Sequence, residues 1–213
     1  MGDLGNYLPA LIRGAILTII LCAVSGSIGT IIGLVFGVGR SSPLLPVRFI
    51  SAIYPNFIRG IPVLVLLFFI YFALPLLFPA LALDRSYVAV AGLSIYTGAY
   101  MAEIFRGSIE AIPAGQSEAA EALGMSYVQK MRHVILPQAM KIAVPPGIGF
   151  LISLVKASSL VSIIGYVDLT YAGKIASTRN QEPLTTFIIV AVLYFIISYP
   201  ISLLGRWYER RLV

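Results

Sequence analysis

Long apolar segments alternate with short polar ones along the chain. Five apolar stretches are long enough to cross a bilayer as helices, which takes about 20 residues each. They cover approximately residues 15–38, 61–83, 87–105, 142–164 and 184–204. Because these stretches are continuously apolar, a β-barrel is disfavoured, and helices satisfy the backbone hydrogen bonds in lipid. The pattern predicts an all-α integral membrane protein with five transmembrane helices, forming one domain over residues 1–213.

Composition supports the membrane interpretation. Of the 213 residues, 59% are hydrophobic and only 11% are charged, whereas soluble domains carry about 25% charged residues. The single cysteine, Cys22, provides neither a disulfide framework nor a cysteine metal site. The net charge of +6 would favour nucleic acid only if the basic residues clustered on a water-facing patch, but they lie between the apolar segments. The sequence therefore indicates lipid surroundings and no nucleic-acid partner.

The basic residues also predict the orientation of the chain. With five spans, one side of the membrane receives ten lysines and arginines, the other side receives four, and Lys156 falls within a span. The larger set is Arg40, Arg48, Arg59, Arg106, Lys130, Arg132, Lys141, Arg206, Arg210 and Arg211. Since cytoplasmic loops carry the excess of lysine and arginine, we expect the N-terminus outside and the C-terminus in the cytoplasm.

The first predicted span carries small residues at helical spacing. Gly29, Gly33 and Gly37 are four residues apart, so they share one face on which another helix can approach closely. Two interpretations remain open here: packing against another helix of the same chain, or a seam between two copies.

The connection between the third and fourth spans has helical signals of its own. A helix is expected to start near Pro113, to continue through an Ala- and Glu-rich turn, and to stop at Gly124. Ser126 and Gln129 form a capping-box pattern for a second short helix, which Pro137 is expected to end or bend. Such a helix–glycine–helix segment suits either docking of a partner protein or a position on the lipid headgroups.

This connection resembles the EAA signature of the membrane subunits of bacterial ABC importers. The residues are Glu118-Ala119-Ala120, three further residues and Gly124, then nine residues and Val134-x-Leu136-Pro137. Val134 stands where the family usually has isoleucine. Further stretches are similar to the polar amino acid uptake branch of that family, namely residues 59–62, 99–107, 112–116, 154–160, 164–165 and 168–170.

The resemblance implies a type I ABC importer permease fold with a cytoplasmic coupling helix between spans 3 and 4, within about residues 113–137. It assigns ATPase coupling to Glu118, Ala119, Ala120, Gly124, Leu136 and Pro137. The implied partners are two cytoplasmic ABC ATPase subunits that bind ATP and Mg, a second permease copy or close paralogue, and an extracytoplasmic amino acid-binding protein. The implied location is the bacterial cytoplasmic (inner) membrane. No cofactor is expected on this chain itself, because its sequence has no phosphate-binding P-loop.

Two ionisable residues fall within the predicted spans, Glu103 and Lys156. A lone charge at the bilayer centre costs about 3 kcal/mol, so such residues face a partner or a water-filled cavity. Because an amino acid is a zwitterion, a pathway for it benefits from both a cation and an anion. We therefore expect Lys156 and Glu103 to line a substrate pathway, with Tyr100, Ser158 and Ser159 supplying neutral hydrogen bonds. The competing interpretation is a structural ion pair between Lys156 and Glu103.

Other function classes have less support. A passive channel or membrane assembly factor would use the same spans but has no need of the spacing in the EAA signature. An intramembrane enzyme is disfavoured, because Ser158 and Ser159 have no accompanying His or Asp pattern, and His133 has no second metal ligand at a suitable spacing. The importer permease is thus the preferred function.

Overall fold

The computed structural model describes residues 4–212, and every element in that range is helical. In chain order the elements are α1 (Leu4–Arg40), α2 (Leu45–Arg59), α3 (Val63–Phe68), the π-helix η1 (Phe69–Ala73), α4 (Leu74–Leu77), the 3-10 helix η2 (Pro79–Leu81), α5 (Arg85–Glu110), α6 (Ala114–Ala122), α7 (Tyr127–Lys130), the π-helix η3 (Met131–Ile135), α8 (Leu136–Ser158), the 3-10 helix η4 (Ser159–Ile164), α9 (Leu169–Asn180) and α10 (Pro183–Leu212).

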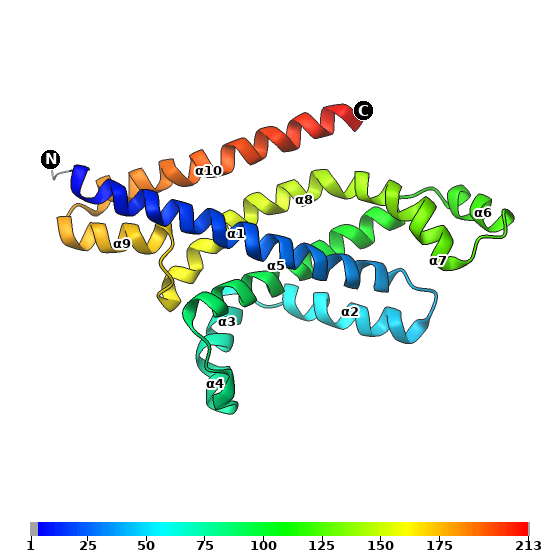
Figure 1. Cartoon of the computed structure of the whole chain (residues 1–213), viewed down its shortest axis with the longest axis horizontal. Coiled ribbons are helices and arrows are strands. Elements are labelled where there is room, and N and C mark those ends of the chain that lie inside the picture. Colours follow the sequence, from blue (N-terminus) through cyan, green and yellow to red (C-terminus); the bar gives the residue numbers. More distant parts are fainter. Residues whose placement is uncertain (1–3, 213) are drawn as a thin grey trace.

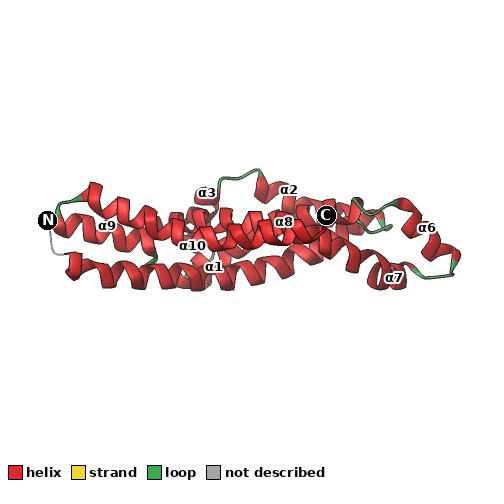
Figure 2. Ribbon diagram, turned by 90° about the horizontal axis from the view of Figure 1, so that it is seen from above, coloured by secondary structure: helices red, strands yellow, loops and turns green. Residues whose placement is uncertain are grey.

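The long helices form an elongated bundle. Helices α1, α5, α8 and α10 run roughly along its longest axis, and α2 lies beside the C-terminal part of α1 (Figure 1). The short helices α6 and α7 project from one end, whereas α9 and the start of α1 lie at the opposite end (Figure 2). The segment between α5 and α8 is therefore set apart from the main bundle.

Within residues 4–212, four helical segments are long and apolar enough to cross a membrane. They are Tyr7–Arg40, Arg85–Glu110, Tyr127–Ile164 and Pro183–Arg210. These segments contain the first, third, fourth and fifth predicted spans, whose helical state is thereby confirmed. The fourth segment includes all of α8 and reaches back into the connection that precedes it.

The bounds predicted for the second span are wrong. The residues expected to form a polar connection make up α2, and the apolar run that follows is divided into α3, η1 and α4. The two halves, Leu45–Arg59 and Val63–Leu77, are bent by 100° and together can form a fifth span. Proline at the start of each half is compatible with this arrangement, since the first turn of a helix does not need its missing N–H.

Of the two outcomes expected at Pro137, an end or a bend of the preceding helix, the end is not observed. Helices α7, η3 and α8 form one continuous segment, and the π turn of η3 comes directly before Pro137. The wider turn accommodates a proline that has no backbone N–H to donate. The fourth span is thus a direct continuation of the segment that carries the EAA signature.

The small residues of α1 pack against α5 of the same chain. A Cβ atom built on Gly29 would lie 2.4 Å from the Thr97 Cβ, and one built on Gly33 would lie 2.4 Å from the Met101 Cβ. A Cβ on Gly37 would lie 2.7 Å from that of Phe105. Both series advance by four residues, so the two helix backbones stay in close approach over two turns. The intramolecular interpretation of this face is confirmed.

The apolar interior lies mainly between α1, α5 and α8, where Leu21, Leu93 and Leu154 are essentially fully buried. The outer side of the bundle is also apolar. On α10, for example, Phe195 and Ile196 are exposed. A bundle that is apolar on both its inside and its outside is typical of a protein surrounded by lipid.

Candidate functional site

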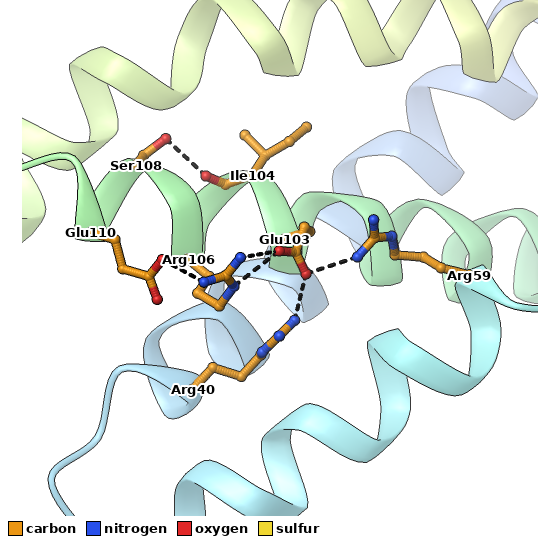
Figure 3. A network of polar contacts seen from close by, with 7 residues as sticks. All are labelled: Arg40, Arg59, Glu103, Ile104, Arg106, Ser108 and Glu110. Atoms are coloured by element: carbon orange, nitrogen blue, oxygen red, sulfur yellow. Dashed lines mark hydrogen bonds and ion pairs between the residues drawn. The ribbon is translucent and has the colours of Figure 1, made fainter.

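A cluster of charged residues joins three helices at one end of the bundle (Figure 3). The Glu103 carboxylate of α5 accepts a hydrogen bond from Arg40 Nη1 of α1 at 2.6 Å and from Arg59 Nη1 of α2 at 2.8 Å. Its other oxygen accepts from Arg106 Nε at 3.0 Å, and Arg106 also pairs with Glu110. Three guanidinium groups therefore converge on one carboxylate, and they tie the C-terminal ends of α1 and α2 to α5.

The competing interpretation of a Lys156–Glu103 ion pair is not observed. Glu103 is paired with the three arginines, and the Lys156 side chain is exposed on α8 with no ion pair among the described residues. Sequence reasoning placed Arg40, Arg59 and Arg106 in cytoplasmic connections and did not connect them to Glu103. The partnership with Arg106 could have been read from the spacing of three residues, but Arg40 and Arg59 are 63 and 44 residues away in sequence.

An aromatic group lies next to this cluster. The Tyr100 ring stacks on that of Phe150 with a centroid distance of 5.1 Å, and it contacts Tyr96 at 4.8 Å. The guanidinium carbon of Arg59 lies 5.6 Å from the centre of the Tyr100 ring, within the range of a cation–π interaction. Arg59 thus connects two of the predicted pathway residues, Glu103 and Tyr100.

Of the other predicted pathway residues, Lys156 and Ser158 lie at the C-terminal end of α8, and Ser159 is the first residue of η4. The Ser158 hydroxyl is buried and donates to the Val155 carbonyl oxygen at 2.8 Å. The Ser159 hydroxyl donates to the Lys156 carbonyl oxygen at 2.7 Å. Both hydroxyl groups donate their proton to a carbonyl oxygen three residues earlier, but each oxygen can still accept a hydrogen bond. The predicted set therefore forms two groups, and the α8 residue Phe150 is in contact with the first of them.

The segment with the EAA signature folds as a helix, a glycine break and a second helix, as predicted. Gly124 has φ +74°, the left-handed conformation that ends α6, and Ser126 with Gln129 forms a complete capping box on α7. Lys130 Nζ donates to Ser117 Oγ at 2.6 Å and pairs with Glu121, so the two helices are braced against each other. The Lys130 ammonium group holds the pKa of the Glu121 carboxyl below its usual range.

The residues expected to couple to ATPases differ in exposure. Glu118, Ala119, Gly124 and Pro137 are exposed, Leu136 is half-buried, and Ala120 is 2% exposed. Ala120 therefore packs inside the segment, which leaves the other positions at its surface. Leu123 and Val128, which the sequence reasoning did not select, are large apolar side chains that are 77% and 70% exposed at the same tip.

The opposite end of the bundle contains a buried polar network that the sequence did not reveal. Asp168 is 0% exposed and caps α9 by accepting a hydrogen bond from the Tyr171 N–H at 2.8 Å. It also accepts from the Tyr194 hydroxyl at 3.1 Å, while Thr18 Oγ1 accepts from the Leu169 N–H at 3.0 Å. Burial raises the pKa of the Asp168 carboxyl, although its hydrogen bonds act in the opposite direction. This network connects α1, α9 and α10.

The described residues contain no group of three His, Cys, Asp or Glu side chains suited to hold a metal ion. The site is instead a combination of arginines, aromatic rings and an exposed helical tip.

Comparison with known proteins identifies the class to which this architecture belongs. The family model described as "Binding-protein-dependent transport system inner membrane component" matches residues 29–213. The probable amino-acid ABC transporter permease protein YckA of Bacillus subtilis (strain 168) is 40% identical over 191 residues, covering 89% of this chain and 83% of YckA. The glutamine transport system permease protein GlnP of Escherichia coli (strain K12) is 38% identical over 206 residues, covering 96% of this chain and 94% of GlnP.

A solved structure shows the same fold. A chain from the crystal structure of an amino acid ABC transporter with histidines aligns with a TM-score of 0.90 and 35% identity, covering 98% of this chain and 96% of that one. The all-helical bundle and its apolar spans agree with the fold of type I ABC importer permeases. The chain therefore belongs to the binding-protein-dependent transport system inner membrane components, the multi-pass permeases of ABC importers.

Proposed function

We propose that this chain is the pathway-forming subunit of an ATP-driven importer for polar amino acids. It works with two ATPase subunits that bind ATP and Mg, with a second permease copy or paralogue, and with an extracytoplasmic amino acid-binding protein. The observation that carries the proposal is the similarity, over nearly the whole chain, to permeases named for amino acids, combined with the separate helical segment at one end of the bundle. In the membrane, this segment faces the cytoplasm and the start of α1 faces outward.

The exposed tip is the part that receives force from the ATPases. Its surface offers small side chains near Glu118 and Ala119, so a groove on a partner can close tightly around α6. Leu123 and Val128 provide apolar area for such a groove. Because Lys130 braces α6 against α7 and α7 continues into α8, a movement of the tip is transmitted directly to the fourth span.

Charge reversal at this tip is expected to uncouple transport. The test uses proteoliposomes that contain the permease, its ATPase and its binding protein. Glu118→Lys should lower uptake about tenfold or more, because the new cation removes a contact with the ATPase of about 1.4 kcal/mol or more. Gly124→Asp should act similarly, because it adds a charged side chain at a left-handed residue. ATP hydrolysis and labelled amino acid uptake are measured together.

The matched control is Glu209→Lys, an equal charge reversal at an exposed position of α10. It should leave uptake and its coupling to hydrolysis unchanged. A passive channel would tolerate all three variants, so unchanged uptake in Glu118→Lys and Gly124→Asp would reject the coupling role.

The substrate pathway is proposed to run past both groups of side chains described above. Lys156 is an exposed cation near the C-terminal end of α8, within a predicted span, so it suits contact with a substrate carboxylate. Tyr100, Ser158 and Ser159 supply neutral hydrogen bonds. Glu103 acts there through Arg59, which it holds beside the Tyr100 ring.

Replacement of Lys156 by methionine tests the pathway. It should lower the rate of uptake about tenfold or more, because a charge-assisted hydrogen bond to the carboxylate is lost. Lys174→Met, at an exposed position of α9, is the control and should transport normally. Normal transport by Lys156→Met with unaltered preference among amino acids would end the idea of direct contact.

A further inference from the structure

A large cavity lies at the end opposite to the EAA segment. Its volume is about 730 Å³, and it is formed by the start of α1, the start of α5, the turn after η4, and α9. Three arginines line it, Arg13, Arg85 and Arg179, against one acidic side chain, Asp84. The cavity is thus strongly cationic, and neither the pathway nor the coupling segment uses it.

None of these three arginines takes part in an ion pair among the residues that the structure describes, and only Arg85 has a hydrogen-bond partner there. Arg85 donates to the Tyr71 hydroxyl at 3.3 Å, and Asp84 accepts from the Ser86 N–H at 2.8 Å. The ion pairs among the described side chains involve neither Arg13 nor Arg179, and both side chains are exposed. Two guanidinium groups are therefore accessible to an anion, and guanidinium matches the geometry of a phosphate with paired hydrogen bonds.

The position of Arg13 along α1 puts the cavity at the level of a lipid headgroup. Arg13 and Arg40 lie on the same helix, and the rise of 1.5 Å per residue separates them by about 40 Å. A bilayer measures about 40–45 Å including both headgroup regions. If Arg40 is at one headgroup layer, in the Glu103 cluster, Arg13 is at the other.

Apolar surface adjoins the same arginine. A smaller cavity of about 430 Å³ runs along α1 and is lined by Leu8, Pro9, Ile12 and Ile16, and Arg13 forms part of its wall as well as that of the larger cavity. The larger cavity also has apolar walls at Leu17 and Ile175. Arg13 therefore stands between a cationic pocket and an apolar groove, an arrangement that matches an amphiphile with a negatively charged head and a hydrocarbon chain.

We propose that this cavity binds the phosphate headgroup of an anionic phospholipid of the outer leaflet, with Arg13 and Arg179 as the phosphate ligands and an acyl chain along the α1 groove. The bound lipid fills the space between α1, α5 and α9. It thereby holds the outer ends of three helices together, as the arginine cluster around Glu103 does at the inner end.

Lipid titration of the assembled transporter tests the proposal. The permease complex with its ATPase, placed in phosphatidylcholine nanodiscs, is supplied with increasing phosphatidylglycerol, and bound lipid is counted by native mass spectrometry. Phosphatidylglycerol should be retained and phosphatidylcholine should not. The double variant Arg13→Gln/Arg179→Gln should weaken retention about tenfold or more, as expected when a charge-assisted hydrogen bond is removed. The matched variant Arg48→Gln/Arg206→Gln, at exposed arginines elsewhere, should retain it fully.

A second variant separates a lipid from a free anion and remains informative if the double variant does not fold. Ile16→Trp fills the α1 groove without changing charge, so it should weaken phosphatidylglycerol retention. Equal retention of both lipids, or full retention in both the arginine and the Ile16 variants, would overturn the proposal. If millimolar inorganic phosphate displaces phosphatidylglycerol, and Ile16→Trp does not change this displacement, the cavity would be assigned to a soluble anion. Loss of binding-protein docking by the arginine variant in pure phosphatidylcholine would assign it to an acidic protein surface.

Discussion

Replacing Gly33 by alanine is expected to destabilise the permease by about 3 kcal/mol, the upper end of the range for overpacking a close contact. The new Cβ would lie 2.4 Å from the Met101 Cβ and 2.9 Å from the Ala102 backbone nitrogen. A backbone atom cannot rotate away, so α1 and α5 must separate, and the neighbouring contacts at Gly29 and Gly37 loosen as well. Thermal unfolding of the detergent-purified complex, monitored by size-exclusion chromatography, measures the loss of stability.

Gly149→Ala is the control for this substitution. Gly149 lies inside α8 with no atom within 4 Å of an added Cβ. Since alanine is a better helix former than glycine by about 1 kcal/mol, this variant should be as stable as the parent or slightly more so. Equal melting temperatures for Gly33→Ala and Gly149→Ala would show that α1 and α5 can separate without cost.

Replacing Glu103 by glutamine is the second substitution with a large expected effect. A neutral amide cannot balance Arg40, Arg59 and Arg106, and the three cations would then repel one another where α1, α2 and α5 meet. Removal of one partner from a buried pair costs about 3–5 kcal/mol. Because the Glu103 side chain is 25% exposed and solvent screens part of the repulsion, we expect about 2 kcal/mol. Uptake should fall with it, since Arg59 would no longer be held beside Tyr100.

Two further variants make the Glu103 experiment specific. Glu110→Gln removes a carboxylate that is 58% exposed from the same cluster, and surface pairs of this kind contribute less than about 1 kcal/mol. The double variant Arg40→Gln/Glu103→Gln removes one cation with the anion, so it should recover part of the stability lost in Glu103→Gln. If Glu103→Gln melts at the same temperature as Glu110→Gln, the carboxylate does not hold the three helices together.

Local signals account for most of what could be predicted from the sequence. Four spans were evident because 20 apolar residues in a row have few alternatives to a membrane helix. The helix–glycine–helix segment was also predictable from local signals. Gly124, Ser126 and Gln129 lie within a few residues of one another and determine its break and its cap.

The remaining features depend on contacts that the sequence does not display. Helix α2 has Arg48 and Arg59 among its apolar positions, and it was predicted as a polar connection. The position of α2 in the bundle is explained only by its packing on α1 and α5. One such contact is the Tyr54 hydroxyl of α2, which donates to the Ile95 carbonyl oxygen of α5 at 2.6 Å. Arg40 and Arg59, as partners of Glu103, and Tyr194, as a partner of Asp168, come likewise from distant parts of the chain, so no spacing rule could have paired them.

The close approach of α1 to α5 also limits how the permease can change shape. Helices α1 and α5 are in close contact at Gly29, Gly33 and Gly37, so they cannot slide or pivot on each other without steric overlap. We therefore expect them to move together as one rigid body. Helix α8 has no such constraint at Gly147 or Gly149 and carries Pro145 and Pro146 in its interior. For the proposed importer we therefore expect that outward and inward access alternate by displacement of α8 relative to the α1–α5 pair. A spin-label pair across α5 and α8 should then report larger distance changes than a pair across α1 and α5.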